Sequence, residues 1–209
     1  MTGLILKDFM VMKKTLFIYA IIGVVYGYMD LTQERHGVMF AMMLICSAMV
    51  PVSSISYDER CKWDKLANTT PVSRSGIIIA KYLFALILTA ISSVYVFCVY
   101  LMDKEMTIVD NISLVAVMAL IAMFYQAVLM PIIIKFGSEK GRMFMMIALF
   151  LPIALIGVVI KLVPGFTQML DRLIFQHEHL LPLIMTGAVL IVYILSMILS
   201  INIYKSKDL

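Results

Sequence analysis

Charged residues are scarce in this chain of 209 residues: they make up 14% of the sequence, against 63% hydrophobic residues. The mean hydropathy is +1.01. Such a balance excludes a water-soluble globular domain and indicates a membrane protein. Cysteine is rare as well. Only positions 46, 61 and 98 carry it, the first and last lie inside apolar runs, and nothing suggests a disulfide framework.

Motifs for catalysis and nucleotide binding are missing. No G-x-x-x-x-G-K-[ST] loop occurs, and the pair Gly137 and Gly141 is followed by Arg142. The chain therefore cannot hydrolyse ATP alone, and we expect it to bind no cofactor. H-E-x-x-H and G-x-S-x-G are also absent, which argues against an intramembrane hydrolase. His177 and His179 have the spacing of a strand and no evident further ligand, so they predict a solvated loop edge rather than a metal site.

Six apolar segments are present, and the last five each exceed the ~20 residues that cross ~30 Å of hydrocarbon as a helix. Runs of this length without alternation exclude a β-barrel. The sequence predicts an all-α membrane protein, a single transmembrane domain over residues 1–209. Its six spans are expected at about 15–31, 37–57, 77–102, 112–134, 143–163 and 180–203.

The first segment is short and follows basic residues, as a signal peptide would. However, no small-x-small cleavage site comes after it. Upstream of it, an apolar stripe at helical spacing comprises Ile5, Phe9, Met12 and Leu16. A retained span preceded by a short interfacial helix on the membrane surface is therefore the better interpretation.

Basic residues are distributed unevenly between alternate loops. One side of the predicted membrane takes thirteen of the 17 Lys and Arg residues, among them Lys7, Lys205 and the cluster near residue 62. Because basic loops stay in the cytoplasm, both termini are predicted to be cytoplasmic in a multi-pass protein. The outer loop at 164–179 has apolar residues at positions 166, 169, 170 and 173, which predict a short re-entrant amphipathic helix.

The longest charged stretch lies inside, between the second and third spans. Residues 58–70 read as a short cytoplasmic helix, with acids in its first turn and Pro71 at its end. Trp63, Leu66 and Ala67 share one stripe, and Ser73 is expected to cap the next span. This helix could transmit force from a cytoplasmic partner, or it could be a surface loop whose tryptophan lies in the lipid interface.

The stretch "YDERCKWDKLANTTPVSRSGIIIAKYL" resembles the loop between the second and third spans of bacterial type-2 ABC transporter permeases. The likeness is strongest to the small two-component branch, in which the ATPase is a separate chain. The matching residues are Asp58, Glu59, Trp63, Pro71, Val72, Ser73, Arg74, Lys81 and Tyr82. The rest of the chain is similar in plan, with an interfacial helix, six spans and a re-entrant element after the fifth.

The resemblance implies that residues 58–70 form the coupling helix, which sits in a groove of an ATPase subunit. Trp63 and Leu66 would be its buried anchors, with Ala67 on the same stripe. Its polar contacts would be Asp58, Glu59, Arg60 and Asp64. The partner ATPase would bind ATP and Mg, the chain would lie in the bacterial cell membrane among its lipids, and no nucleic-acid partner is expected.

Small and polar residues in the spans have two interpretations each. Gly23 and Gly27 form G-x-x-x-G, which suits packing inside the chain or a dimer seam with a second permease, identical or paralogous. The family plan favours the seam. Ser92, Ser93 and Gln126 are candidate polar residues of a transport path, although serine is also a common packing residue.

No span carries a charge near its centre, and Lys81 is expected to extend its charge toward the headgroups. An ionic cargo is therefore disfavoured. We expect an ATP-driven exporter of hydrophobic or amphipathic molecules, with short membrane-active peptides first. The alternative is a secondary transporter or channel that is not coupled to ATP, for which no inverted repeat is visible.

Overall fold

The computed structural model describes residues 2–33, 37–67, 73–102, 107–162 and 180–206, and every element within these ranges is a helix. The helices are α1 (Thr2–Gln33), α2 (Gly37–Arg60), α3 (Trp63–Ala67), α4 (Arg74–Tyr100), α5 (Ile108–Leu162) and α7 (Leu180–Lys205). Four described stretches are long and apolar enough to cross a membrane: Thr2–Thr32, Arg74–Tyr100, Ile108–Gly137 and Pro182–Lys205. The chain is thus an all-α protein with several apolar helices.

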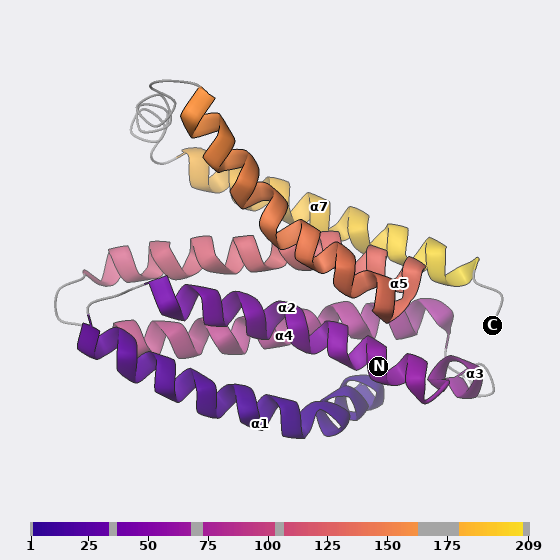
Figure 1. Ribbon diagram of the computed structural model, residues 1–209. Helices are drawn as coiled ribbons and strands as arrows, with labels where there is room; N and C mark the ends of the chain where they lie inside the picture. Colours follow the sequence, from indigo (N-terminus) through magenta and orange to yellow (C-terminus); the bar gives the residue numbers. More distant parts are fainter. Residues whose placement is uncertain (1, 34–36, 68–72, 103–106, 163–179, 207–209) are drawn as a thin grey trace.

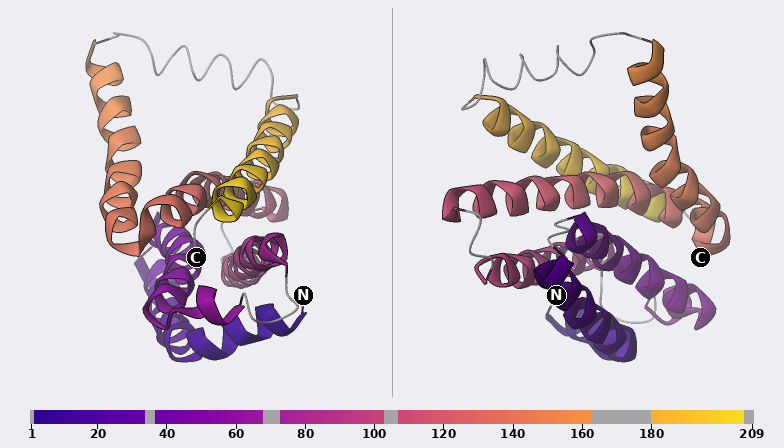
Figure 2. Two further views of the ribbon diagram at one scale, coloured as in Figure 1. Left: turned by 90° about the vertical axis from the view of Figure 1, so that its right-hand side faces the viewer. Right: turned by 60° about the vertical axis from the view of Figure 1, so that its left-hand side comes forward.

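The helices form a bundle around α4 and the first half of α5 (Figures 1 and 2). α2 contacts α1, α4 and α5, while α7 contacts α4 and α5. The start of α1 and the end of α7 lie toward the end of the bundle that carries α3 (Figure 1). An Arg74 guanidinium N–H donates to the Lys205 carbonyl, which joins the start of α4 to the end of α7.

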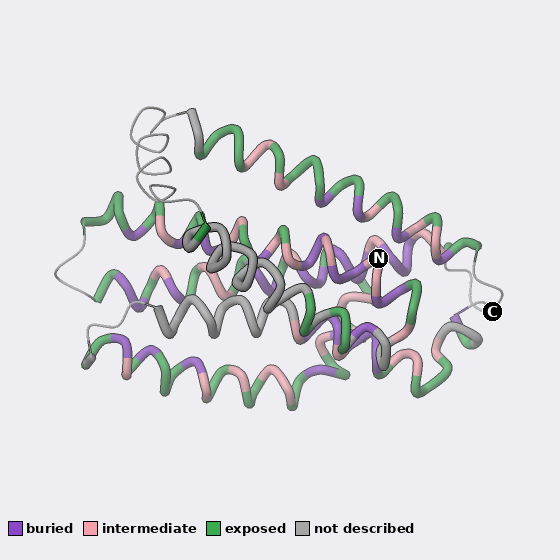
Figure 3. Tube along the Cα trace, turned by 45° about the horizontal axis from the view of Figure 1, so that its top comes forward, coloured by how far each residue is buried: buried purple, intermediate pink, exposed green. Residues whose placement is uncertain are grey.

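Among the residues whose burial is described, burial is concentrated at the end of the bundle near α3 and along α4 and the first half of α5 (Figure 3). One core cluster joins Ile77 and Tyr82 of α4, Ile133 of α5 and Tyr204 of α7, and Trp63 of α3 packs against it. The outer faces of α1 and α7 are rich in exposed aliphatic side chains. That pattern suits helices whose outer faces meet lipid.

The N-terminal stripe faces the protein. Met12 is fully buried beside Val50 and Phe84, and Ile5, Phe9 and Leu16 pack around it. The Phe9 and Phe84 rings meet edge to face, with centroids 5.0 Å apart. The expected interfacial helix and first span are one continuous helix, α1, whose first turns swing away from the line of the rest (Figure 1). The stripe therefore packs on α2 and α4.

α5 is a helical hairpin. Gly137 has φ 81° and ψ 170°, which interrupts the helix inside the loop predicted at 135–142. A Cβ added to Gly141 would lie 2.8 Å from Cγ1 of Ile133, so the returning helix needs glycine there to approach so closely. The two glycines allow the fold to reverse within a few residues.

The expected single helix at 58–70 is wrong in its extent. Asp58 to Arg60 form the last turn of α2, the chain turns at Lys62 with φ 51°, and α3 covers only Trp63–Ala67. The predicted stop at Pro71 lies outside the described residues, as does the re-entrant element at 164–179 and the pair His177 and His179. The Ser73 cap is confirmed, because its hydroxyl accepts from the Gly76 N–H at 3.1 Å.

Candidate functional site

The corner formed by the end of α2 and α3 is the candidate functional site. Trp63 is half-buried against the core, and the ammonium of Lys7 lies 4.3 Å from the centroid of its ring. Ala67 is buried, whereas Leu66 is 58% exposed. The predicted stripe is therefore divided: Trp63 and Ala67 hold α3 to its own chain, and Leu66 points outward.

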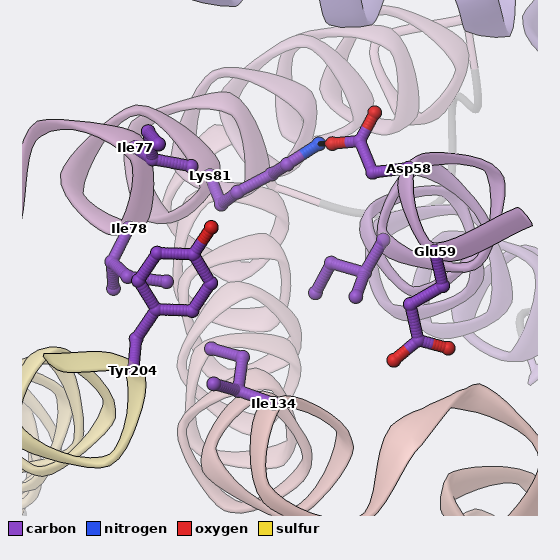
Figure 4. A pocket seen from close by; sticks show the side chains of 8 residues that line it. Asp58, Glu59, Ile77, Ile78, Lys81, Ile134 and Tyr204 are labelled. Carbon is purple, nitrogen blue, oxygen red and sulfur yellow. Dashed lines mark ion pairs between the residues drawn. The ribbon is translucent and has the colours of Figure 1, made fainter. Parts of the chain in front are cut away.

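Asp58 faces the bundle. Its carboxylate accepts from the Lys7 ammonium at 2.8 and 3.0 Å, and its Oδ2 lies 2.6 Å from Nζ of Lys81. Figure 4 shows this second pair, with α2 and α4 supplying one side chain each. Of the expected polar contacts for a partner, Asp58 is thus engaged within the chain.

Lys81 is the centre of the charge arrangement. It is 4% exposed, so the expectation that its charge reaches the headgroups is wrong. Its ammonium has three N–H groups, and three oxygens surround it: Asp8 Oδ1 at 2.7 Å, Asp58 Oδ2 at 2.6 Å and Ser54 Oγ at 2.6 Å. Ser54 in turn donates to Asp8 at 3.0 Å. Burial of this cation is tolerated because it donates hydrogen bonds to Asp8 and Ser54 and also forms an ion pair with Asp58.

We call Lys7, Asp8, Asp58 and Lys81 the ionic cluster. It contains two cations and two anions, contributed by α1, α2 and α4, and its charge is balanced. The sequence reasoning missed Asp8, Lys7 and Ser54. A signal was present: Asp8 lies three residues after Ile5 on the apolar stripe, and an acid on a buried helix face needs a cationic partner.

A small cavity of about 30 Å³ adjoins the cluster (Figure 4). Its lining combines Asp58, Glu59 and Lys81 with the aliphatic residues Ile55, Ile77, Ile78 and Ile134 and with Tyr204. This volume has room for one or two water molecules and none for a peptide or drug-sized molecule.

The remaining residues predicted at this corner are placed differently from one another. Glu59 reaches the hairpin turn of α5, since a Cβ on Gly137 would lie 3.4 Å from its Oε1. Arg60 is exposed. The backbone of Asp64 belongs to α3, and its side chain lies outside the described part of the chain.

The polar candidates in the spans connect helices. Gln126 of α5 is buried and donates to the Thr89 hydroxyl of α4 at 2.8 Å. Ser93 donates to the Thr89 carbonyl one turn back, and Ser92 is half-buried. A network that the sequence did not suggest joins α4 to α7, where the Tyr82 hydroxyl lies 2.8 Å from Ser196 Oγ and 2.7 Å from Ser200 Oγ. These contacts hold the bundle together.

Gly23 and Gly27 are both buried. A Cβ on Gly23 would lie 3.5 Å from the Tyr95 ring, so this face of α1 packs on α4 of the same chain. A role in a seam between two permeases stays a prediction.

Comparison with known proteins gives one match. Residues 3–205 match the family described as ABC-2 family transporter protein. No curated protein and no solved structure matches the chain. The family supplies the membrane component of ABC transporters and implies a separate ATP-binding partner, in agreement with the resemblance seen at residues 57–83. Because the match covers nearly its whole length, the chain belongs to the ABC-2 family of transporter proteins.

Proposed function

We propose that this chain is the membrane subunit of an ATP-driven exporter, a single permease domain with six spans and cytoplasmic termini. The observation that carries the proposal is the form of the α3 corner. A helix of five residues presents Leu66 outward while Trp63, Lys7 and Asp58 fix it to the bundle. A short helix held in this way can receive force from an ATP-binding subunit and pass it to the spans.

The proposed cargo is hydrophobic or amphipathic, with short membrane-active peptides first. Lys7 and Lys81 pair with Asp8 and Asp58, so the four charges are neutralised within the fold and offer little to an ionic substrate. The cavity beside them is also too small for a peptide. The transport path is therefore proposed to form between two permease copies, identical or paralogous, and Ser92, Ser93 and Gln126 are candidate residues near it.

A secondary transporter is the competing function. The observation in its favour is the ionic cluster itself, because buried ionisable residues in membrane helices often serve ion coupling. The difference between the two functions lies in the energy source.

The deciding experiment uses proteoliposomes that contain this chain and its ATP-binding partner subunit. We expect a labelled amphipathic peptide to accumulate in inside-out vesicles with ATP and not with a non-hydrolysable analogue. Accumulation driven by a proton gradient without nucleotide would support the secondary transporter instead. Loss of peptide tolerance and secretion after deletion of the chain would test the cargo in cells, and unchanged tolerance and secretion would count against peptides.

A further inference from the structure

We propose that the ionic cluster is the joint that fixes α3 relative to α1, α2 and α4, and that its four members are positioning residues for coupling. The idea rests on the proposed function, in which α3 receives the stroke of the ATP-binding subunit. The proposal adds a set of contacts through which a movement of the ATP-binding subunit would be transmitted to the membrane spans.

The route can be followed contact by contact. The Lys7 ammonium touches both the Trp63 ring of α3 and the Asp58 carboxylate of α2. The second carboxylate oxygen of Asp58 forms an ion pair with the Lys81 ammonium of α4. Lys81 also forms an ion pair with Asp8 of α1, and the Asp8 carboxylate lies 3.3 Å from the Lys7 ammonium. Three helices and α3 thus meet through four charged side chains.

α3 cannot hold its own position. Five residues are too few to form a stable isolated helix, so its placement depends on tertiary contacts. The preceding residue, Lys62, has a left-handed φ of 51°, a conformation that persists only where surrounding contacts enforce it. Besides the packing of Trp63 and Ala67, the Lys7 ammonium over the indole ring links α3 to α1.

The burial of the cluster makes the joint stiff. The Lys81 and Asp8 side chains are 5% and 2% exposed, so water screens their attraction little. A shift of one helix would separate charges in a region of low dielectric, and the neighbouring helices would have to follow.

The first test needs no partner subunit, because Trp63 is the only tryptophan in the chain. Its fluorescence in the purified full-length protein reports the position of α3. We expect Asp58→Asn and Lys7→Met each to raise the acrylamide quenching constant of Trp63 at least ~2-fold, since each unbalances the charges of the cluster and loosens the hold on the ring. Lys13→Met is the matched control: it removes an exposed lysine from the same helix and should leave quenching unchanged. Unchanged quenching in both cluster variants would overturn the joint.

The second test separates positioning from folding. Lys81→Met combined with Asp8→Asn removes one cation and one anion, so the remaining Lys7 and Asp58 stay balanced. We expect near-normal melting and Trp63 quenching, yet at least ~5-fold less transport per ATP hydrolysed, because α4 has lost its tie to α3. Normal transport per ATP in this variant would show a structural role only. If the unaltered protein shows no ATP-dependent transport, the proposed function fails, while the quenching result still decides whether the joint exists.

Discussion

Lys81 shows what a cation requires when an apolar helix carries it into a membrane bundle. An unpaired ammonium in that environment would cost far more than the fold can supply, but three oxygens at 2.6 to 2.7 Å replace the hydration shell. Removing one member of such a group lowers the stability of the fold more than replacing the whole group by apolar residues would, because the remaining partners stay buried with their charge.

We therefore expect Lys81→Met to lower the free energy of unfolding by about 3–5 kcal/mol, since Asp8 and Asp58 are then left with a single cation. Thermal melting of the purified chain in detergent measures this. Adding Asp8→Asn should recover most of the loss, and a double variant no more stable than the single one would contradict the charge-balance argument.

Gly137 carries a second residue-level prediction. Its φ of 81° lies where a Cβ is strained, and that Cβ would meet the Glu59 carboxylate. We expect Gly137→Ala to destabilise the chain by about 1–2 kcal/mol in the same melting experiment. Gly187→Ala is the control, because the helical Gly187 has open space around its Cα, and alanine there should stabilise the chain by about 0.5–1 kcal/mol. Equal effects of the two variants would show that the α5 turn is not the cause.

At the scale of the element, α3 divides its residues between two tasks. Trp63 and Ala67 attach the helix to the core, and Leu66 is exposed and is the residue that we propose contacts the partner. Affinity at protein interfaces is concentrated in a few anchors, and a charge introduced at such an anchor must be desolvated on binding.

Leu66→Glu should accordingly weaken co-purification of the ATP-binding subunit by ~30-fold or more, with melting unchanged. Leu66→Met keeps the apolar bulk and should bind normally. Trp63→Ala is expected to lose transport and co-purification as well, but with a lower melting temperature, because its ring also packs on the core. Retained association in Leu66→Glu would exclude this face as the docking surface.

For the whole molecule, the arrangement of the ends makes orientation testable with native cysteines. Cys61 is exposed beside α3, and Cys98 is exposed in the last turn of α4 at the opposite end of the bundle. If α3 faces the cytoplasm, the two thiols lie on opposite sides of the membrane.

A membrane-impermeant maleimide should therefore label a chain retaining only Cys61 in inside-out vesicles and not in intact cells. A chain retaining only Cys98 provides the comparison, with labelling from the outer side or none where lipid covers the thiol. Labelling of Cys61 in intact cells would reverse the proposed orientation.

The class of this protein and most of its helices follow from local features of the sequence. Apolar run length, helical spacing and the Ser73 cap are local signals, and local signals decide where helices start and stop. The stripe through Met12 was likewise predicted as one face, although the sequence did not tell what covers it.

How the charged residues pair could not be predicted from the sequence, because it depends on the packing of distant helices. Asp8 and Lys81 stand 73 residues apart, and their contact depends on how α1 and α4 are rotated and packed. The same packing turns Asp58 toward the bundle and ends α2 after Arg60, leaving α3 with five residues. Periodicity in the sequence shows that a helix has a buried face. Which distant charged residue lies opposite that face is set by non-local packing. In this chain that packing surrounds the α3 corner with ion pairs.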